Sequence, residues 1–141
     1  TVTKSGTGSG IVAASPGRLS WSGAVGSILY DYGTAVALTA TPDADATFTG
    51  WSGGGCSSEA TCNLTMDAAK SLVAGFRIIL KGDINDSLTV DLADAILAMK
   101  IISGVILSGT VNQQADVNGD QKIGLAEVLY ILQKVAGMRQ N

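Results

Sequence analysis

The residues best suited to chemistry are the acidic side chains of the C-terminal part, which are gathered rather than spread. All seven acidic residues after position 80 fall in two windows of twelve residues, 83–94 and 116–127. They are Asp83, Asp86, Asp91, Asp94, Asp116, Asp120 and Glu127. An apolar segment follows each window, and carboxylates in this arrangement are typical of loops that hold a hard cation through oxygen ligands. The five acidic residues before position 80 are scattered and indicate no comparable site.

The two windows belong to an internal repeat. Segment 82–104 aligns with segment 115–137 without a gap. Identical pairs are Asp83 and Asp116, Asn85 and Asn118, Leu92 and Leu125, Ala93 and Ala126, and Gly104 and Gly137. A repeat of this kind implies two equivalent units that pack together.

The spacing within each window matches a twelve-residue calcium loop, whose oxygen ligands come from positions 1, 3, 5, 7 (a backbone carbonyl), 9 and 12. The first window supplies Asp83, Asn85, Ser87, the Thr89 carbonyl, Asp91 and Asp94. The second supplies Asp116, Asn118, Asp120, the Lys122 carbonyl and Glu127, with a water needed at position 9, which is Gly124. The pattern predicts two calcium ions. The alternative is a pair of Asx-type turns that cap helices without metal.

Position 6 departs from the usual calcium loop in both windows. This position is normally glycine because its backbone needs a positive φ. Here it is Leu88 in the first window and Gln121 in the second. Each side chain costs about 1 kcal/mol if its residue adopts that conformation.

The composition excludes several other kinds of chemistry. The chain of 141 residues has no histidine, which rules out Ser-His-Asp and Cys-His nucleophile systems and histidine-ligated zinc. Its net charge of −3 argues against nucleic-acid binding, and its apolar runs are too short to span a membrane. A glycosidase needs two paired carboxylates in a cleft, and the acids outside the windows are scattered. We therefore expect a protein that is not an enzyme.

The two cysteines indicate a disulfide. Cys56 and Cys62 flank five residues in a loop rich in glycine and serine, and a bridge there is worth about 2 kcal/mol in the chain-entropy model. The alternative, a zinc site, has too few soft ligands. A stable disulfide indicates a location outside the cytosol. The first residues show no apolar signal segment, so we expect a mature form or a fragment of a larger secreted protein.

The composition also changes near residue 80 and predicts two small domains, 1–80 and 81–141. In the first, apolar residues alternate with small or polar ones over 35–40, 61–66 and 71–76, which predicts an all-β module. In the second, apolar residues recur at helical spacing from about residues 92 and 125 until a glycine ends each run. This pattern predicts an all-α domain with two F-hand calcium loops.

The aromatic residues of the N-terminal module allow two interpretations. Phe48 and Trp51 lie in one short run and are expected to fill a small core. Stacking on a sugar ring is the alternative role for Trp51 and is also open to Trp21, Tyr30 and Tyr32, so carbohydrate binding through the β domain is an alternative function.

Three runs of the N-terminal module resemble a known family. They read TVTKSGTGSGIV, YGTAVALTATPDADATFTGWSGGGC and CNLTMDAAKSLVAGF, and they are similar to the divergent internalin-B-type repeat of bacterial surface and secreted proteins. The resemblance covers most of residues 1–77, but the second cysteine pair common in members is absent from the run WSGAVG. It implies a β-rich extracellular spacer or adhesive repeat without catalytic residues.

The C-terminal repeat resembles the dockerin module. The matching runs are GDINDSLTVDLADAILAMK and ADVNGDQKIGLAEVLYILQ, within residues 82–137. The resemblance implies a calcium-stabilised three-helix module that docks onto a cohesin partner, in extracellular and often polysaccharide-degrading assemblies. The partner surface implied by the family falls on Leu92, Ala93, Leu125 and Ala126, and the identity of the two pairs suggests two equivalent docking modes. The alternative is a structural or adhesive surface segment that calcium only rigidifies.

Overall fold

The computed structural model describes residues 1–107 and 109–139. The chain divides into two compact units, Thr1–Ile78 and Ile79–Asn141. The division lies just before the composition change near residue 80. Among the described residues, no helix has the length and apolar character that crossing a membrane requires.

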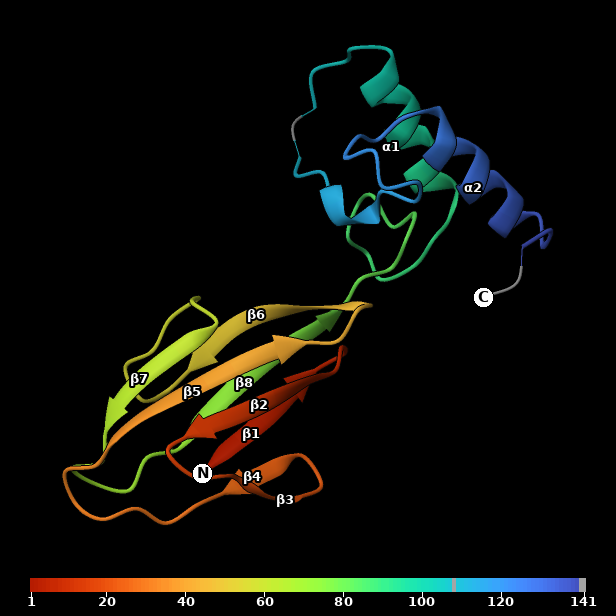
Figure 1. Ribbon diagram of the computed structural model, residues 1–141. Coiled ribbons are helices and arrows are strands. Elements are labelled where there is room, and N and C mark those ends of the chain that lie inside the picture. Colours follow the sequence, from red (N-terminus) through yellow and green to blue (C-terminus); the bar gives the residue numbers. More distant parts are fainter. Residues whose placement is uncertain (108, 140–141) are drawn as a thin grey trace. The chain divides into compact units, whose positions relative to one another are not determined.

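The N-terminal unit is a β-sandwich (Figure 1). Its described strands are β1 (Val2–Gly6), β2 (Gly10–Ser15), β3 (Ser20–Ser22), β4 (Val25–Ser27), β5 (Ala35–Pro42), β6 (Ala46–Ser52), β7 (Thr61–Thr65) and β8 (Leu72–Ile78). One sheet has the order β3-β4-β1-β8-β6, and the other has the order β2-β5-β7. The first and last strands pair in parallel, with Val2 opposite Leu72, so the two ends of the unit are joined within one sheet.

The three strands expected from alternation are confirmed. Residues 35–40, 61–66 and 71–76 correspond to β5, β7 and β8, with small shifts at their ends. In β5 and β7 the apolar side chains face the same side, since Val36 lies opposite Leu64 and Leu38 opposite Cys62. The alternation therefore works as expected, with one face of each strand buried and the other facing solvent.

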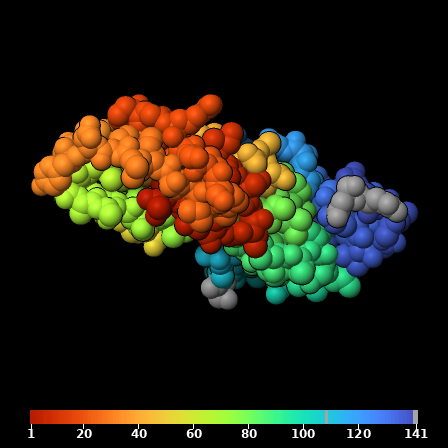
Figure 2. Space-filling view, turned by 90° about the horizontal axis from the view of Figure 1, so that it is seen from below, coloured from red at the N-terminus to blue at the C-terminus, as the bar shows by residue number. Residues whose placement is uncertain are grey.

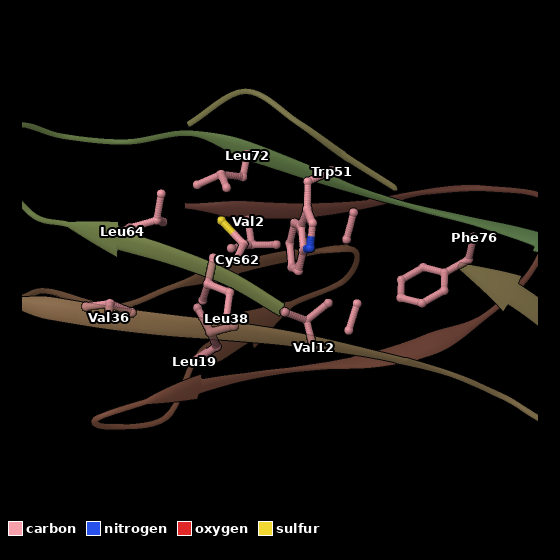
Figure 3. Packing of buried hydrophobic residues seen from close by; sticks show 12 residues of the cluster. Val2, Val12, Leu19, Val36, Leu38, Trp51, Cys62, Leu64, Leu72 and Phe76 are labelled. Carbon is pink, nitrogen blue, oxygen red and sulfur yellow. The ribbon is translucent and has the colours of Figure 1, made fainter. Parts of the chain in front are cut away.

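The core of this unit lies between the two sheets (Figure 3). Trp51 is 7% exposed, and its ring meets Phe48 edge to face with centroids 5.5 Å apart. Phe48 meets Phe76 in the same way at 5.6 Å. A Cβ at Gly10 would overlap the Phe76 ring, so a glycine is needed where β2 crosses this cluster. The core role expected for Trp51 is confirmed.

The expected disulfide between Cys56 and Cys62 is also confirmed, with Cα atoms 5.6 Å apart. It joins the loop after β6 to the buried start of β7, where Cys62 is 2% exposed. The bridge therefore ties a surface loop to the core of the sandwich.

The C-terminal unit contains two helices and one short 3-10 turn within its described residues. They are α1 (Leu92–Ile102), η1 (Gln113–Ala115) and α2 (Leu125–Val135). Asp91 caps α1 by accepting a hydrogen bond from the Ala93 N–H, and each helix is followed by a glycine with positive φ, Gly104 or Gly137. A small core holds the helices together, formed by Ile84, Ala95, Ala98, Ala115, Ile123, Val128 and Ile131.

The predicted fold class is wrong in its second half, because the C-terminal unit is not an all-α domain with two F-hand calcium loops. The described chain is mostly β, with eight strands in two sheets and two short helices near the C-terminus. Among its described residues, bends, turns and irregular segments occupy most of the C-terminal unit outside α1 and α2. Gly82, Gly104 and Gly119 have φ values of 87°, 70° and 80°, which do not continue a right-handed helix. The third helix implied by the dockerin resemblance is reduced to the three residues of η1.

Candidate functional site

The first aspartate of each acidic window accepts hydrogen bonds from the backbone of the loop that folds around it. Asp83 is 1% exposed, and its Oδ1 and Oδ2 accept hydrogen bonds from the N–H groups of Ser87 at 2.9 Å and Leu88 at 2.8 Å. In the second window, Asp116 accepts the Gln121 N–H at 2.7 Å. Leu88 and Gln121 are counterparts in the internal repeat, so this hydrogen bond recurs in both windows.

Two opposing effects act on the pKa of the Asp116 carboxyl. Burial would raise this pKa, but hydrogen bonds from the N–H groups of Gln121, Gly119 and Asn118, together with the charge of Lys81, lower it below its ordinary value. The loop therefore stabilises the ionised, negatively charged form of the Asp116 side chain.

The last acid of each window connects the loop to its helix. Both are buried, with Asp94 at 0% and Glu127 at 1% exposure. Asp94 Oδ1 accepts from the Ile84 N–H at 2.9 Å and Oδ2 from the Asp91 N–H at 2.9 Å. Glu127 repeats this arrangement, accepting from the Val117 and Gly124 N–H groups at 3.1 and 2.6 Å. Each carboxylate thus fastens the second residue of its window to the start of the following helix.

The backbone adopts the left-handed conformation at the same two positions of each window. Position 4 has φ values of 62° at Asp86 and 80° at Gly119. Position 6 has φ values of 65° at Leu88 and 62° at Gln121. The expectation that position 6 needs a positive φ, although it is not glycine, is confirmed.

The other expected ligands contact groups within their own loops. Asn85 Oδ1 accepts from the Ser87 N–H at 3.0 Å, and Ser87 Oγ lies 2.9 Å from Thr89 Oγ1. Asn118 Oδ1 accepts from the Asp120 N–H at 3.2 Å, and Asp120 Oδ1 accepts from the Lys122 N–H at 2.9 Å. Within the part of the chain that the structure describes, no three Asp, Glu, Cys or His side chains converge as a ready metal cluster.

Two residues that the sequence did not single out link one window to the other. Asn112 Nδ2 donates to the Asp83 carbonyl at 3.0 Å, and Lys81 Nζ donates to the Asp116 carbonyl at 2.7 Å. Neither occupies a ligand position. Their one sequence signal is that each lies shortly before the start of a window.

The two helices expose equivalent apolar faces, which we call the paired apolar faces. On α1 the face consists of Leu92, Ile96, Met99 and Ile102, and on α2 it consists of Leu125, Leu129, Leu132 and Val135, with side chains between 43% and 64% exposed. Every member has its counterpart at the aligned position of the other repeat. The dockerin resemblance implied Leu92, Ala93, Leu125 and Ala126, with Met99 and Lys100 on the same face. Most of the apolar face was not predicted, because helical spacing alone does not separate an exposed apolar face from a buried one.

The aromatic candidates outside the core differ in their surroundings. Trp21 is 37% exposed, with Lys4 Nζ 4.8 Å from its ring centroid. A Cβ at Gly26 would lie 3.0 Å from the same ring, so Trp21 covers that glycine on the neighbouring strand. Tyr32 is 86% exposed and lines a pocket that also contains Tyr30.

Residues 1–80 match the family model of the divergent InlB B-repeat domain. The match covers the β-sandwich and ends shortly before the first acidic window, and no dockerin family model matches. No curated protein and no solved structure matches the chain.

Proposed function

The chain belongs to the divergent InlB B-repeat domain family, and we propose that it is a non-catalytic module of a secreted protein whose C-terminal unit binds calcium and docks onto a protein partner. The β-sandwich serves as the extracellular spacer that presents this unit. The disulfide between Cys56 and Cys62 supports a location outside the cytosol.

The observation that carries the calcium proposal is the repetition of one hydrogen-bond pattern in both windows. Asp83 and Asp116 each accept the N–H of position 6, and Asp94 and Glu127 each accept the N–H groups of positions 2 and 9. If each window only capped its own helix, the two windows would not need the same backbone conformation, including the left-handed backbone at positions 4 and 6. A shared ligand geometry accounts for both similarities.

The donor atoms of the windows fit calcium. Each window offers three carboxylates at ligand positions together with amide, hydroxyl or carbonyl oxygens, and neither offers sulfur or imidazole. Such a set suits a hard cation that accepts six to eight oxygens. Binding would draw Asn118, Asp120 and the Lys122 carbonyl toward Asp116, and Asn85, Ser87, Asp91 and the Thr89 carbonyl toward Asp83.

A calcium titration after EGTA treatment tests this proposal, with helical circular dichroism and thermal melting as readouts. We expect calcium to increase helicity and raise the melting temperature of the C-terminal unit. The variant Glu127→Gln should weaken binding at the second window by roughly 10-fold or more. Asp45→Asn, which removes the same charge from the sandwich, should bind as the wild type does. Unchanged helicity and melting on calcium addition would contradict the proposal.

The docking proposal is supported by the paired apolar faces. An exposed apolar surface of this kind, repeated on two helices, is typical of a protein-interaction site. The dockerin resemblance suggests a cohesin-type domain as the partner, with Leu92, Ala93, Leu125 and Ala126 in the contact. Because the two faces consist of counterparts in the internal repeat, either face is able to present a similar surface to the partner.

A pull-down against a panel of cohesin domains tests docking, using Leu92→Asp, Leu125→Asp and the double variant. If the faces are equivalent, each single variant retains binding and the double variant loses it. Ile11→Asp, on an exposed position of β2, is the matched control and should bind as the wild type does. Equal retention of the double variant and the wild type would remove the paired apolar faces from the proposal. Calcium binding without capture of any cohesin would favour the rigidified structural segment instead.

A further inference from the structure

A pocket of about 760 Å³ lies in the β-sandwich between two loops, the segment 28–32 after β4 and the segment 66–71 before β8. In Figure 2 the orange segment near residue 30 protrudes beside the yellow-green segment near residue 70. The volume falls within the range of small-molecule and cofactor sites. The pocket lies within the N-terminal unit and is separate from the acidic windows.

The walls of this pocket are fixed by backbone hydrogen bonds. Gly33 N–H donates to the Met66 carbonyl and Met66 N–H donates to the Thr34 carbonyl, both at 2.9 Å, so the two loops are joined at one end. Leu72 N–H donates to the Thr1 carbonyl at 3.0 Å and fixes the other end. The pocket is therefore largely formed before a ligand arrives.

Two exposed side chains of the pocket lining, Leu29 and Tyr32, lie outside the core of the sandwich, whereas Tyr30 packs against that core. Leu29 is 98% exposed and Tyr32 is 86% exposed. Tyr30 contributes a second ring, whose hydroxyl already donates to the Pro16 carbonyl, so this ring is held in place from behind. Two tyrosine rings within one concave site offer faces on which a flat apolar surface can stack.

The polar groups around these rings point to an uncharged, hydroxyl-rich ligand. Lys70 lines the pocket, and its Nζ lies 2.6 Å from Asp67 Oδ1, so its charge is neutralised by its neighbour. The Lys70 ammonium has three N–H donors, so it keeps donors for a sugar hydroxyl beside this ion pair. Ser27 and Ser71 add hydroxyl groups to the lining.

An extended peptide fits this site less well. Peptides bound by strand addition need free N–H and carbonyl groups along a sheet edge. Here the N–H groups of Gly33, Met66 and Leu72 are all paired within the unit. Strand addition is therefore closed at these three positions, and recognition by ring faces and side-chain polar groups matches the alternating C–H faces and hydroxyls of a sugar.

We infer that this pocket binds a neutral polysaccharide, with Tyr32 as the stacking platform and Lys70, whose charge is paired with Asp67, as a hydrogen-bonding group for sugar hydroxyls. This role is independent of calcium binding and of cohesin docking. It gives the β-sandwich a ligand of its own.

Affinity gel electrophoresis of the full chain, in gels containing hydroxyethylcellulose, xylan or galactomannan, tests the inference. We expect retardation in at least one of these gels, both with calcium and with EGTA. Tyr32→Ala should weaken the apparent affinity roughly 5-fold to 10-fold, the value of one aromatic contact, whereas Tyr32→Phe keeps the ring and should stay within about 2-fold of the wild type. Ile11→Ala, an exposed apolar residue outside the pocket, is the matched control and should not change migration.

Three results would overturn the inference. The first is migration that none of the neutral polysaccharides slows. The second is retardation that Tyr32→Ala leaves unchanged. The third is retardation only in gels that contain heparin or a denatured, unglycosylated protein, which would identify an anionic or polypeptide ligand instead.

Discussion

The N–H of Gly82 donates a hydrogen bond to the carbonyl of Ala115 over 2.9 Å, and these two residues are counterparts in the internal repeat. Each directly precedes the first aspartate of an acidic window. The Asn112 N–H adds a second link by donating to the Ile84 carbonyl at 2.9 Å. The entrances of the two windows are therefore hydrogen-bonded to each other, so that order in one favours order in the other.

Asn112→Ala should destabilise the C-terminal unit through this link. The substitution removes the donor to the Asp83 carbonyl and the acceptor for the Gln114 N–H, at 3.0 and 3.1 Å. At about 1 kcal/mol for each hydrogen bond, the free energy of unfolding should fall by roughly 1–2 kcal/mol. Urea unfolding followed by the helical circular dichroism signal measures the change. Gln113→Ala, at a neighbouring position, should have little effect, and equal losses in the two variants would argue against the link.

Gln121→Gly tests the strain at position 6. Its backbone has a φ of 62°, which costs a residue with a side chain about 1 kcal/mol and glycine almost nothing. Glycine also increases the conformational entropy of the unfolded chain, which lowers stability at any position. Lys122→Gly is the matched control, because the backbone of Lys122 does not have a positive φ. In chemical denaturation we expect Gln121→Gly to be more stable than Lys122→Gly by about 1 kcal/mol. Identical stabilities would show that position 6 stores no strain.

Local features of the fold were predictable from the sequence, because each depends on a few neighbouring residues. The positive φ at position 6 was expected from the loop spacing. Strands β5, β7 and β8 were predicted from the alternation of apolar and polar residues, which matches their buried and exposed faces. The short strands β3 and β4 were not predicted, because serine and glycine dominate them and leave little alternation. The parallel pairing of β1 with β8 was also out of reach, since it joins the first strand of the unit to the last.

The errors in the C-terminal unit have a physical cause as well. Apolar residues at helical spacing predicted both helices, but this spacing did not reveal that turns occupy the rest of the unit or that Ile96 and Leu129 face outward. In each helix the inward face uses small or branched residues such as Ala98 and Ile131, and the larger outward residues follow the same period. Lys81 and Asn112 make hydrogen bonds between the two windows. Such contacts form only when the windows pack against each other, so the sequence of one window does not predict them.

Cys56→Ser should weaken the sandwich by removing the bridge to Cys62. The closed loop is short, so the loss should be about 2 kcal/mol in the free energy of unfolding. Tryptophan fluorescence during urea unfolding reports this loss, because Trp51 lies in the same core. Reductant should destabilise the wild type by a similar amount and leave Cys56→Ser unchanged. A wild type that is insensitive to reductant would show that the bridge adds no stability.

Tyr30 should make the sandwich less stable at alkaline pH. Burial raises the pKa of its hydroxyl, whereas in the unfolded chain the group has its ordinary pKa of about 10. The unfolded chain therefore loses this proton first, so the stability from Tyr30 is fully present below about pH 10 and is lost as pH rises through the folded-state pKa. Urea midpoints from tryptophan fluorescence between about pH 7 and pH 11 measure this loss.

Tyr30→Phe separates this effect from general alkaline unfolding. At neutral pH the variant should lose about 1 kcal/mol, because the hydrogen bond to the Pro16 carbonyl disappears. Its stability should then fall less steeply than that of the wild type above about pH 10, since no partly buried hydroxyl remains at this position to ionise. Tyr32→Phe removes a hydroxyl that is already in solvent, because this side chain is 86% exposed, and should keep the full alkaline loss. If the stabilities of Tyr30→Phe and Tyr32→Phe fall equally steeply with pH, ionisation of the Tyr30 hydroxyl does not cause the loss.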